Sequence, residues 1–392
     1  MPSQHDKKTF KLKDVLLSRN TLLIVYILAA VIGTVAKLLL PPFESNGLHY
    51  PQLQNFAIFR NSFFHLIHHQ DLYTTFPLEQ MDFFKYSPTF ALLMGPFAIL
   101  PYGLGAIAWN LANALALFFA VWLIPGESDR RKAWVLWFVL LSLMVNIQNA
   151  QSNALMAALM LGSWVAQERG NPLASSFCMV LSVFTKLFGG LALLPCLLSR
   201  KRITELIAYS AVWTALMTFA PLAVVSPAQL TFLYRSWYAR LQSDGSSHIG
   251  LSLMGVMQTW FHITIPGHIA LPAGGAILIL VLIARRDAHQ DFYFRLLAVS
   301  SVLIWVIIFN HMAESPTMIV AITGVALWYF FQPASTANRI LLVISFVFTC
   351  LAPTDIMPRP LRQQFKVGYA EAAPCILVWF KVQYDLLRFP RG

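Results

Sequence analysis

The sequence predicts an α-helical protein that crosses a membrane several times. Of its 392 residues, 57% are hydrophobic and only 11% are charged, and the mean hydropathy is +0.62. A soluble globular domain carries roughly 25% charged residues. Several apolar runs approach the roughly 20 residues that cross a bilayer core as a helix. The runs lie at 21–40, 88–124, 133–147, 153–166, 173–198, 204–225, 269–284, 296–309, 316–331 and 340–352. We therefore expect a single integral membrane domain over 1–392, all-α and polytopic, with about ten to thirteen membrane helices.

The distribution of basic residues predicts how the chain is oriented. A polar, basic tail at 1–19 precedes the first apolar run, and no small-residue cleavage site follows that run, so a retained helix is favoured over a signal peptide. The net charge is +11, and its basic clusters lie at the ends of apolar runs. This pattern is typical of the positive-inside rule and does not indicate a nucleic-acid partner. We expect a cytoplasmic tail, with the long loops 41–86 and 226–267 on the non-cytoplasmic face.

Two apolar runs contain a break. The residues "LPYG" at 100–103 indicate a turn within 88–124, and Lys186 with the glycines at 189–190 interrupts 173–198. Broken helices are tolerated only where protein or a water-filled cavity surrounds them. The sequence therefore predicts that protein or a water-filled cavity surrounds both breaks, while the number of crossings in these two runs stays open.

The loop 41–86 combines a helical pattern with acidic residues. Apolar residues recur at helical spacing within 55–69, which predicts an amphipathic helix along the membrane interface. Asp71 and Asp82 follow in short aromatic segments, directly before an apolar run. A carboxylate there would lie at the depth of a lipid's phosphate. Histidines at 65, 68 and 69 lack the spacing of a zinc motif, so we expect no metal site.

Further polar residues lie within or beside the apolar runs. Lys186 is an ammonium group in apolar surroundings, where ionisable residues usually face a cavity and have a partner. The alternative is that it snorkels to an interface. The amides of 146–153 could bind sugar hydroxyls or only pack helices, and Glu314 could be a charge at a helix N-terminus. No phosphate-binding loop, dinucleotide fingerprint, nucleophile elbow or catalytic triad is present.

Several stretches resemble one known family. "NFAIFRNSFFHLIHHQDLYTTFP" and "FKYSPTFALLMGPFAILP" resemble the first-loop signature of glycosyltransferase family 87, and "NAQSNALMAALMLGSWVA" and "LSVFTKLFGGLALLPCLLSRKR" resemble its later stretches. The resemblance covers roughly residues 50 to 320. It implies a GT-C fold and a hexosyl- or pentosyltransferase of the bacterial inner membrane. Such an enzyme moves mannose or arabinose from a polyprenyl-phosphate donor to a lipid-linked or cell-envelope glycan acceptor on the non-cytoplasmic face.

One departure from the family concerns the catalytic acid. The position of the family's proposed catalytic aspartate is Asn55 here, and an amide cannot take a proton. An inverting transfer needs a carboxylate base and phosphate-binding cations on either side of the sugar. We expect the base to be Asp82, Asp71 or Glu44, in that order. The candidates for holding the donor phosphate are Lys186, Arg60, Lys85 and Tyr86, and those for the sugar or acceptor are Asn55, Gln151, Asn153, His248, His311 and Glu314.

The expected partners follow from the reaction. They are membrane lipid, a polyprenyl-phosphate-linked sugar and a lipid-linked or glycan acceptor. Because polyprenyl phosphate already leaves as a stable anion, no cofactor and no obligatory metal are implied, although a divalent ion would be compatible. Two alternatives remain. A transporter or flippase of lipid-linked sugars would also need Lys186 and broken helices, and an inactive assembly subunit would account for Asn55.

Overall fold

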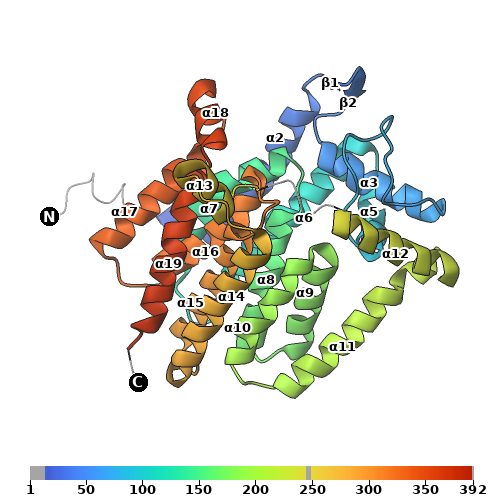
Figure 1. Ribbon diagram of the computed structural model, residues 1–392. Coiled ribbons are helices and arrows are strands. Elements are labelled where there is room, and N and C mark those ends of the chain that lie inside the picture. Colours follow the sequence, from blue (N-terminus) through green and yellow to red (C-terminus); the bar gives the residue numbers. More distant parts are fainter. Residues whose placement is uncertain (1–13, 244–248, 391–392) are drawn as a thin grey trace.

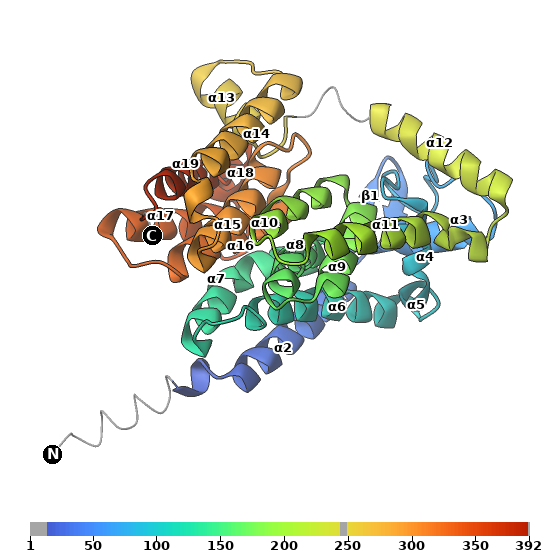
Figure 2. The same ribbon diagram turned by 90° about the horizontal axis from the view of Figure 1, so that it is seen from below.

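The computed structural model describes residues 14–243 and 249–390, and it confirms a helical chain (Figures 1 and 2). The longer helices are α2 (Arg19–Leu38), α3 (Gln54–Ile67), α6 (Tyr102–Trp122), α7 (Asp129–Gln148), α8 (Asn153–Glu168), α9 (Pro172–Thr185), α11 (Ile203–Phe219), α12 (Pro227–Ser243), α14 (Gly267–Ala284), α15 (Phe292–Ile308), α16 (Met318–Phe330) and α19 (Ala373–Leu387). Shorter ones are α4 (Pro88–Leu93), α5 (Gly95–Ala98), α10 (Leu193–Leu198), α13 (Leu253–Phe261), α17 (Thr336–Ser345) and α18 (Arg359–Val367). Short stretches of other helix types are η1 (Leu187–Ala192), η2 (Ala220–Ala223), η3 (Arg286–Ala288), η4 (Ser315–Thr317) and η5 (Phe346–Leu351).

The protein is a multi-pass membrane protein. Within the described ranges, four helical segments are long and apolar enough to cross a membrane, namely α2, α6, Ile203–Ala223 and α14. Five shorter apolar helices accompany them, at Pro172–Thr185, Leu187–Leu198, Phe292–Ile308, Ser315–Phe330 and Thr336–Leu351. The expectation of ten to thirteen crossings stays a prediction, because the shorter helices span a bilayer only where it is thinned or lined by protein.

The core lies where α15 and α16 pack together. Every residue of α15 from Phe294 to Ile308 is buried. Gly324 on α16 lets the two backbones approach closely, since a Cβ atom there would lie 2.7 Å from the backbone oxygen of Ser300. The hydroxyl of Ser300 donates to the backbone oxygen of Gly324 at 2.5 Å. The tight contact between these helices therefore depends on a glycine and a serine facing each other.

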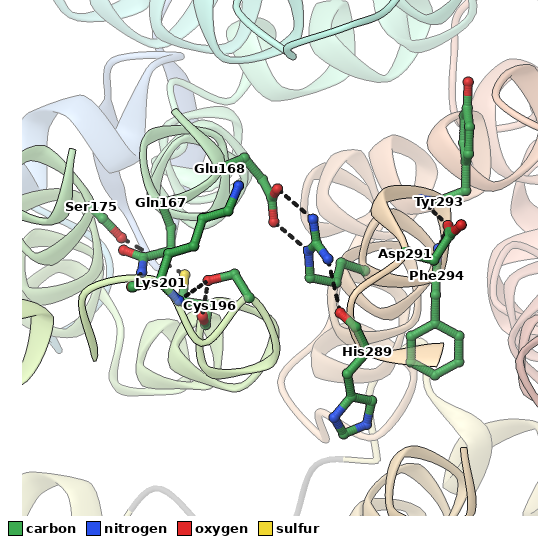
Figure 3. A network of polar contacts seen from close by, with 11 residues as sticks. Gln167, Glu168, Ser175, Cys196, Lys201, His289, Asp291, Tyr293 and Phe294 are labelled. Atoms are coloured by element: carbon green, nitrogen blue, oxygen red, sulfur yellow. Dashed lines mark hydrogen bonds and ion pairs between the residues drawn. The ribbon is translucent and has the colours of Figure 1, made fainter. Parts of the chain in front are cut away.

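A buried ion pair joins the end of α8 to the start of α15 (Figure 3). The guanidinium of Arg295 donates to both carboxylate oxygens of Glu168, at 2.6 and 2.7 Å. Their side chains are only 5% and 3% exposed. Arg295 also donates to the backbone oxygen of His289 at 2.8 Å. Since water does not reach these charges, each satisfies the other, and the pair fixes the relative position of the two helix ends.

Both predicted breaks are confirmed. The run 88–124 is divided into α4, α5 and α6, and α6 begins at Tyr102 inside the predicted turn. In the run 173–198, α9 ends at Thr185, and Lys186 has an extended backbone. The chain then turns sharply at Gly189, where a Cβ atom would lie 2.6 Å from the backbone carbon of Ser182. The glycine is thus required by the close return of the chain onto α9.

A small β-hairpin departs from the all-α expectation. Strands β1 (Phe43–Ser45) and β2 (Leu48–Tyr50) pair antiparallel, with Phe43 opposite Tyr50. Asn46 and Gly47 form the turn with φ of 53° and 75°. An Asn-Gly pair is a strong hairpin signal, so the sequence did contain the information.

The predicted helix in the loop 41–86 is confirmed as α3. Its apolar side is covered by protein: Phe56, Phe59 and Leu66 are at most 1% exposed. The ring of Phe59 makes edge contacts with Tyr86 and Phe90 and with Trp109 of α6. The helix therefore carries the first loop against α4 and α6, and its placement along a membrane interface stays a prediction.

Candidate active site

Segments that are far apart in the sequence surround a cavity of about 1270 Å³. One wall is the loop before α4 together with Arg240 at the end of α12. A second is formed by residues 249–251 and 311–316, and a third by α18 and the turn that follows it. Its charged and titratable lining residues are Asp82, Lys85, Arg240, His311, Glu314, Arg359, Arg362, Lys366, Tyr369 and Glu371. Charged residues from separate segments thus line one cavity.

Asp82 is an accessible carboxylate on the first wall, with a side chain that is 56% exposed. One carboxylate oxygen accepts from the backbone N–H of Phe83 at 2.7 Å, and the other lies 3.8 Å from Nζ of Lys85. The guanidinium of Arg240 lies 3.8 Å from the centre of the Phe83 ring. Asp82 is therefore oriented by its own loop, with cationic groups beside it.

Lys186 lies next to the second wall. Its Nζ is 2.5 Å from the side-chain oxygen of Asn153, whose amide nitrogen donates to the backbone oxygen of Pro316 at 3.2 Å. Pro316 lines the cavity, whereas Lys186 does not. The ammonium also lies 5.7 Å from the centre of the Tyr86 ring. Lys186 thus has the partner that its position predicted, and one asparagine connects it to the wall.

Tyr86 follows Lys85 of the first wall in the chain, and its ring lies close to Lys186. Its hydroxyl is 3.1 Å from the hydroxyl of Ser152, and its ring stacks on Phe90 at 4.5 Å. Burial raises the pKa of Tyr86 well above its usual value, and the negative charge of Glu314 acts in the same direction. The phenol therefore stays neutral at physiological pH.

Glu314 and His311 lie on the second wall, where the chain is tightly packed. The backbone N–H of Leu251 donates to the backbone oxygen of Ala313 at 2.7 Å. Gly250, with φ of 49°, fits only without a side chain, since a Cβ atom would lie 2.8 Å from the backbone nitrogen of Ala313. Glu314 caps η4 through a reciprocal pair with Thr317. Glu314 is accordingly both a helix cap and part of the cavity wall.

Three candidates lie away from the cavity. The carboxylate of Asp71 accepts from the hydroxyl of Ser236 at 2.9 and 2.8 Å, which links the first loop to α12. Glu44 is exposed on β1, opposite His49. The guanidinium of Arg60 lies 4.8 Å from the centre of the Phe64 ring on its own helix. Neither Asp71 nor Glu44 nor Arg60 lines the wall. Their assignment to catalysis or phosphate binding has no support in this arrangement.

The remaining amide and histidine candidates differ in position. The side chain of Asn55 donates to the backbone oxygen of Asn149 at 2.9 Å, and Asn149 lines the cavity. The backbone oxygen of Gln151 accepts from the side chain of Asn146 at 3.0 Å. Asn55 and Gln151 do not themselves line the wall. His248 lies outside the described residues.

The profile of glycosyltransferase family 87 matches residues 83–354, more than half of the chain. The chain belongs to glycosyltransferase family 87. The match includes Lys85, Tyr86, Asn153 and Lys186, whereas Asp82 and the rest of the first loop precede it. A search of curated proteins gives no match.

The structure of this family 87 member is similar to that of ArnT from Cupriavidus metallidurans in the apo state. The TM-score is 0.50 at 11% sequence identity, and the alignment covers 93% of this chain and 76% of that chain. ArnT from the same organism bound to undecaprenyl phosphate gives a TM-score of 0.46 at 14% identity, with the same coverage. The first of these similarities shows that the chain has the GT-C membrane fold.

Sequence reasoning missed five charged residues of the wall: Arg240, Arg359, Arg362, Lys366 and Glu371. The last four lie beyond the segment that matches family 87. Glu371 is only 1% exposed, and its Oε2 has no hydrogen-bond partner among the described residues. Burial raises the pKa of Glu371, while a hydrogen bond from Ser315 and the charge of Lys366 lower it. For the last four residues the only advance signal was the polar character of 353–372, and Arg240 lies within the long predicted loop 226–267.

Proposed function

We propose that this family 87 member is an inverting glycosyltransferase that uses a polyprenyl-phosphate sugar as its donor. It passes the sugar, mannose or arabinose, to a lipid-linked or cell-envelope glycan acceptor. The observation that carries the proposal is the position of Asp82, an accessible carboxylate in a large cavity that is otherwise rich in cations. In this proposal the cavity opens on the non-cytoplasmic side of the bacterial inner membrane, where the acceptor glycan is built.

Asp82 acts as the general base in this reaction. It takes the proton from an acceptor hydroxyl while that oxygen forms a bond to the anomeric carbon of the sugar. The bond from the anomeric carbon to the phosphate oxygen breaks, and polyprenyl phosphate leaves with the electron pair. The proton remains on Asp82 until it is released to water. Atoms and charge balance without a cofactor or a metal ion.

The phosphate must lie on the far side of the sugar from the base. Lys186 and its partner Asn153 stand next to the second wall, and Tyr86 lies beside them as a neutral hydrogen-bonding group. A phosphate group near Pro316 would be stabilised by this ammonium in surroundings of low polarity. Lys85 lies close to Asp82, with its Nζ 3.8 Å from a carboxylate oxygen. Glu314 and His311 can then bind hydroxyls of the sugar or acceptor.

A transfer assay tests the proposal. The purified chain in lipid nanodiscs is incubated with radiolabelled polyprenyl-phosphomannose or polyprenyl-phosphoarabinose and a bacterial lipid extract. We expect label in the acceptor fraction. Asp82→Asn should lower the rate at least about a hundredfold at an unchanged melting temperature. Glu44→Gln is the matched control, because this exposed carboxylate lies away from the cavity.

The other outcomes identify the competing functions. Donor movement across the bilayer of a proteoliposome without transfer would support a carrier. The absence of both donor movement and sugar transfer, with the fold intact, would support an inactive assembly subunit. Full activity of Asp82→Asn would show that a different group is the base.

A further inference from the structure

Helix α18 presents a basic face to the cavity. Five of its nine residues line the wall: Arg359, Arg362, Gln363, Lys366 and Val367. They recur at the spacing of a single helix face. The helix carries no acidic residue. Figure 1 shows α18 projecting from the body of helices, above α13 and α19.

The charges on this face are available to a ligand. Arg359 and Lys366 are exposed, and neither side chain has a hydrogen-bond or ion-pair partner among the residues that the structure describes. Arg362, between them, forms an ion pair with Asp355. The charge of Arg359 acts on Asp355 and that of Lys366 acts on Glu371, but neither cation forms an ion pair with these acids in the described part of the chain. The two cations lie seven residues apart on one helix face and can approach a phosphate group from both sides.

Core packing does not explain why α18 is there. None of its residues is buried. Its base is nevertheless held firmly, because the indole of Trp260 donates to the backbone oxygen of Gly368 at 2.6 Å. The ring of Phe365 makes an edge contact with Phe348 at 5.2 Å. A helix that has no fully buried residue and faces a cavity with cations is better explained by a ligand than by core packing.

The volume of the cavity leaves room for such a ligand. Pockets for single small molecules measure roughly 300–1,000 Å³, and this cavity is about 1270 Å³. The proposed base and donor-phosphate groups belong to other walls, formed by the loop before α4 and by residues near Pro316. The α18 wall is thus not needed for the donor.

We propose that α18 binds a phosphate group of the acceptor through Arg359 and Lys366, with Arg362 between them. The acceptor would accordingly be an anionic, phosphate-bearing molecule. The ligand's role as acceptor rests on the proposed function. The presence of an anion site on α18 does not depend on that function. The same chemistry would also suit the headgroup of an anionic membrane lipid, and the experiment separates the two sources.

The site is tested by titrating inorganic pyrophosphate into the purified full chain in neutral detergent, with calorimetric detection. We expect the double variant R359Q/K366Q to bind about tenfold more weakly. The control R130Q/R339Q removes the same charge from exposed arginines outside the cavity and should bind like the wild type. R359K/K366R should retain most of the affinity. Coinciding curves for wild type and R359Q/K366Q would overturn the proposal.

A second arm identifies the source of the phosphate. The titration is repeated in nanodiscs of phosphatidylcholine alone and in nanodiscs that also contain phosphatidylglycerol. Unchanged binding supports an acceptor phosphate, and loss of binding with phosphatidylglycerol would overturn that assignment in favour of a lipid headgroup.

In the transfer assay, R359Q/K366Q should raise KM for the acceptor several-fold with little change in kcat, and an unchanged KM would contradict the acceptor role. Absence of transfer by the wild type would instead refute the proposed function, whatever the titration shows.

Discussion

The ammonium nitrogen of Lys186 lies 2.5 Å from the side-chain oxygen of Asn153, and the amide nitrogen of that asparagine donates to the backbone oxygen of Pro316. A single side chain at the start of α8 therefore connects the break after α9 with the turn that holds Glu314. A substitution at one of these positions should therefore alter the packing and hydrogen bonding at the others.

We expect Asn153→Ala to reduce transfer and to lower stability by about 1–3 kcal/mol, because the buried carbonyl of Pro316 loses its donor and Lys186 loses its acceptor. Asn113→Ala is the matched control. Asn113 is also buried and makes two hydrogen bonds, to Trp109 and Leu155, within the helical body. Its loss should lower the melting temperature similarly but leave kcat nearly unchanged. Equal kcat values for the two variants would show that the link to Lys186 is not used.

Asp71 should prove structural. Since the hydroxyl of Ser236 donates to its carboxylate, with both oxygens within hydrogen-bond distance, we expect Asp71→Ala to lower stability by about 1–3 kcal/mol. Ser236→Ala should have a smaller effect, and the double variant should be no less stable than Asp71→Ala alone, because both changes remove one interaction. Thermal unfolding of the four proteins measures this cycle. Additive losses would mean that the two side chains do not interact.

Glu371 should make stability depend on pH. Burial raises its pKa in the folded protein, above the unfolded value of about 4.3. The folded state therefore binds this proton more tightly, and its stability falls as pH rises from about 4.3 through the folded pKa. We expect Glu371→Gln to melt at a higher temperature than the wild type near neutral pH.

Melting curves between about pH 4 and pH 8 should show that this difference shrinks toward the acidic end. Glu44→Gln, at an exposed position, should follow the wild type throughout. A difference between Glu371→Gln and the wild type that stays constant over the range would contradict the assignment.

The elements that the sequence predicted best are those that depend on local pattern. The breaks at 100–103 and at Lys186, and the helix α3, follow from glycine, proline and apolar spacing within a few residues. Lys186 stood out because a charge in an apolar run is rare. The hairpin turn at Asn46 carried an equally local signal that was not used.

The parts that could not be predicted depend on contacts between distant segments. Asp71 and Asp82 both lie in short aromatic segments of the first loop, and only the contact with Ser236 on α12 distinguishes the hydrogen-bonded carboxylate of Asp71 from the accessible one of Asp82. Glu371 and the cations of α18 look like ordinary loop residues until the fold brings them to the cavity that Arg240 also lines. Charged residues are common in polar segments, so the role of any one of them depends on the residues that the fold places next to it.

The ion pair between Glu168 and Arg295 should be costly to break. Because both side chains are buried, Glu168→Gln leaves an uncompensated guanidinium, and we expect a loss of about 3–5 kcal/mol in stability. The apolar double variant Glu168→Leu with Arg295→Met should recover much of this loss, since it removes both charges. Thermal unfolding in detergent measures both. A loss as large in the double variant as in the single one would show that the pair contributes through shape and not through charge.

Helix α18 has no fully buried side chain, yet five of its residues line the cavity in which the sugar would be transferred. Its sequence is therefore almost free of the constraints that fix the transmembrane bundle. Substitutions in α18, or its replacement by another short helix, should leave the rest of the protein folded. Different acceptors could then be bound through changes in α18, while the residues proposed for the transfer step stay the same.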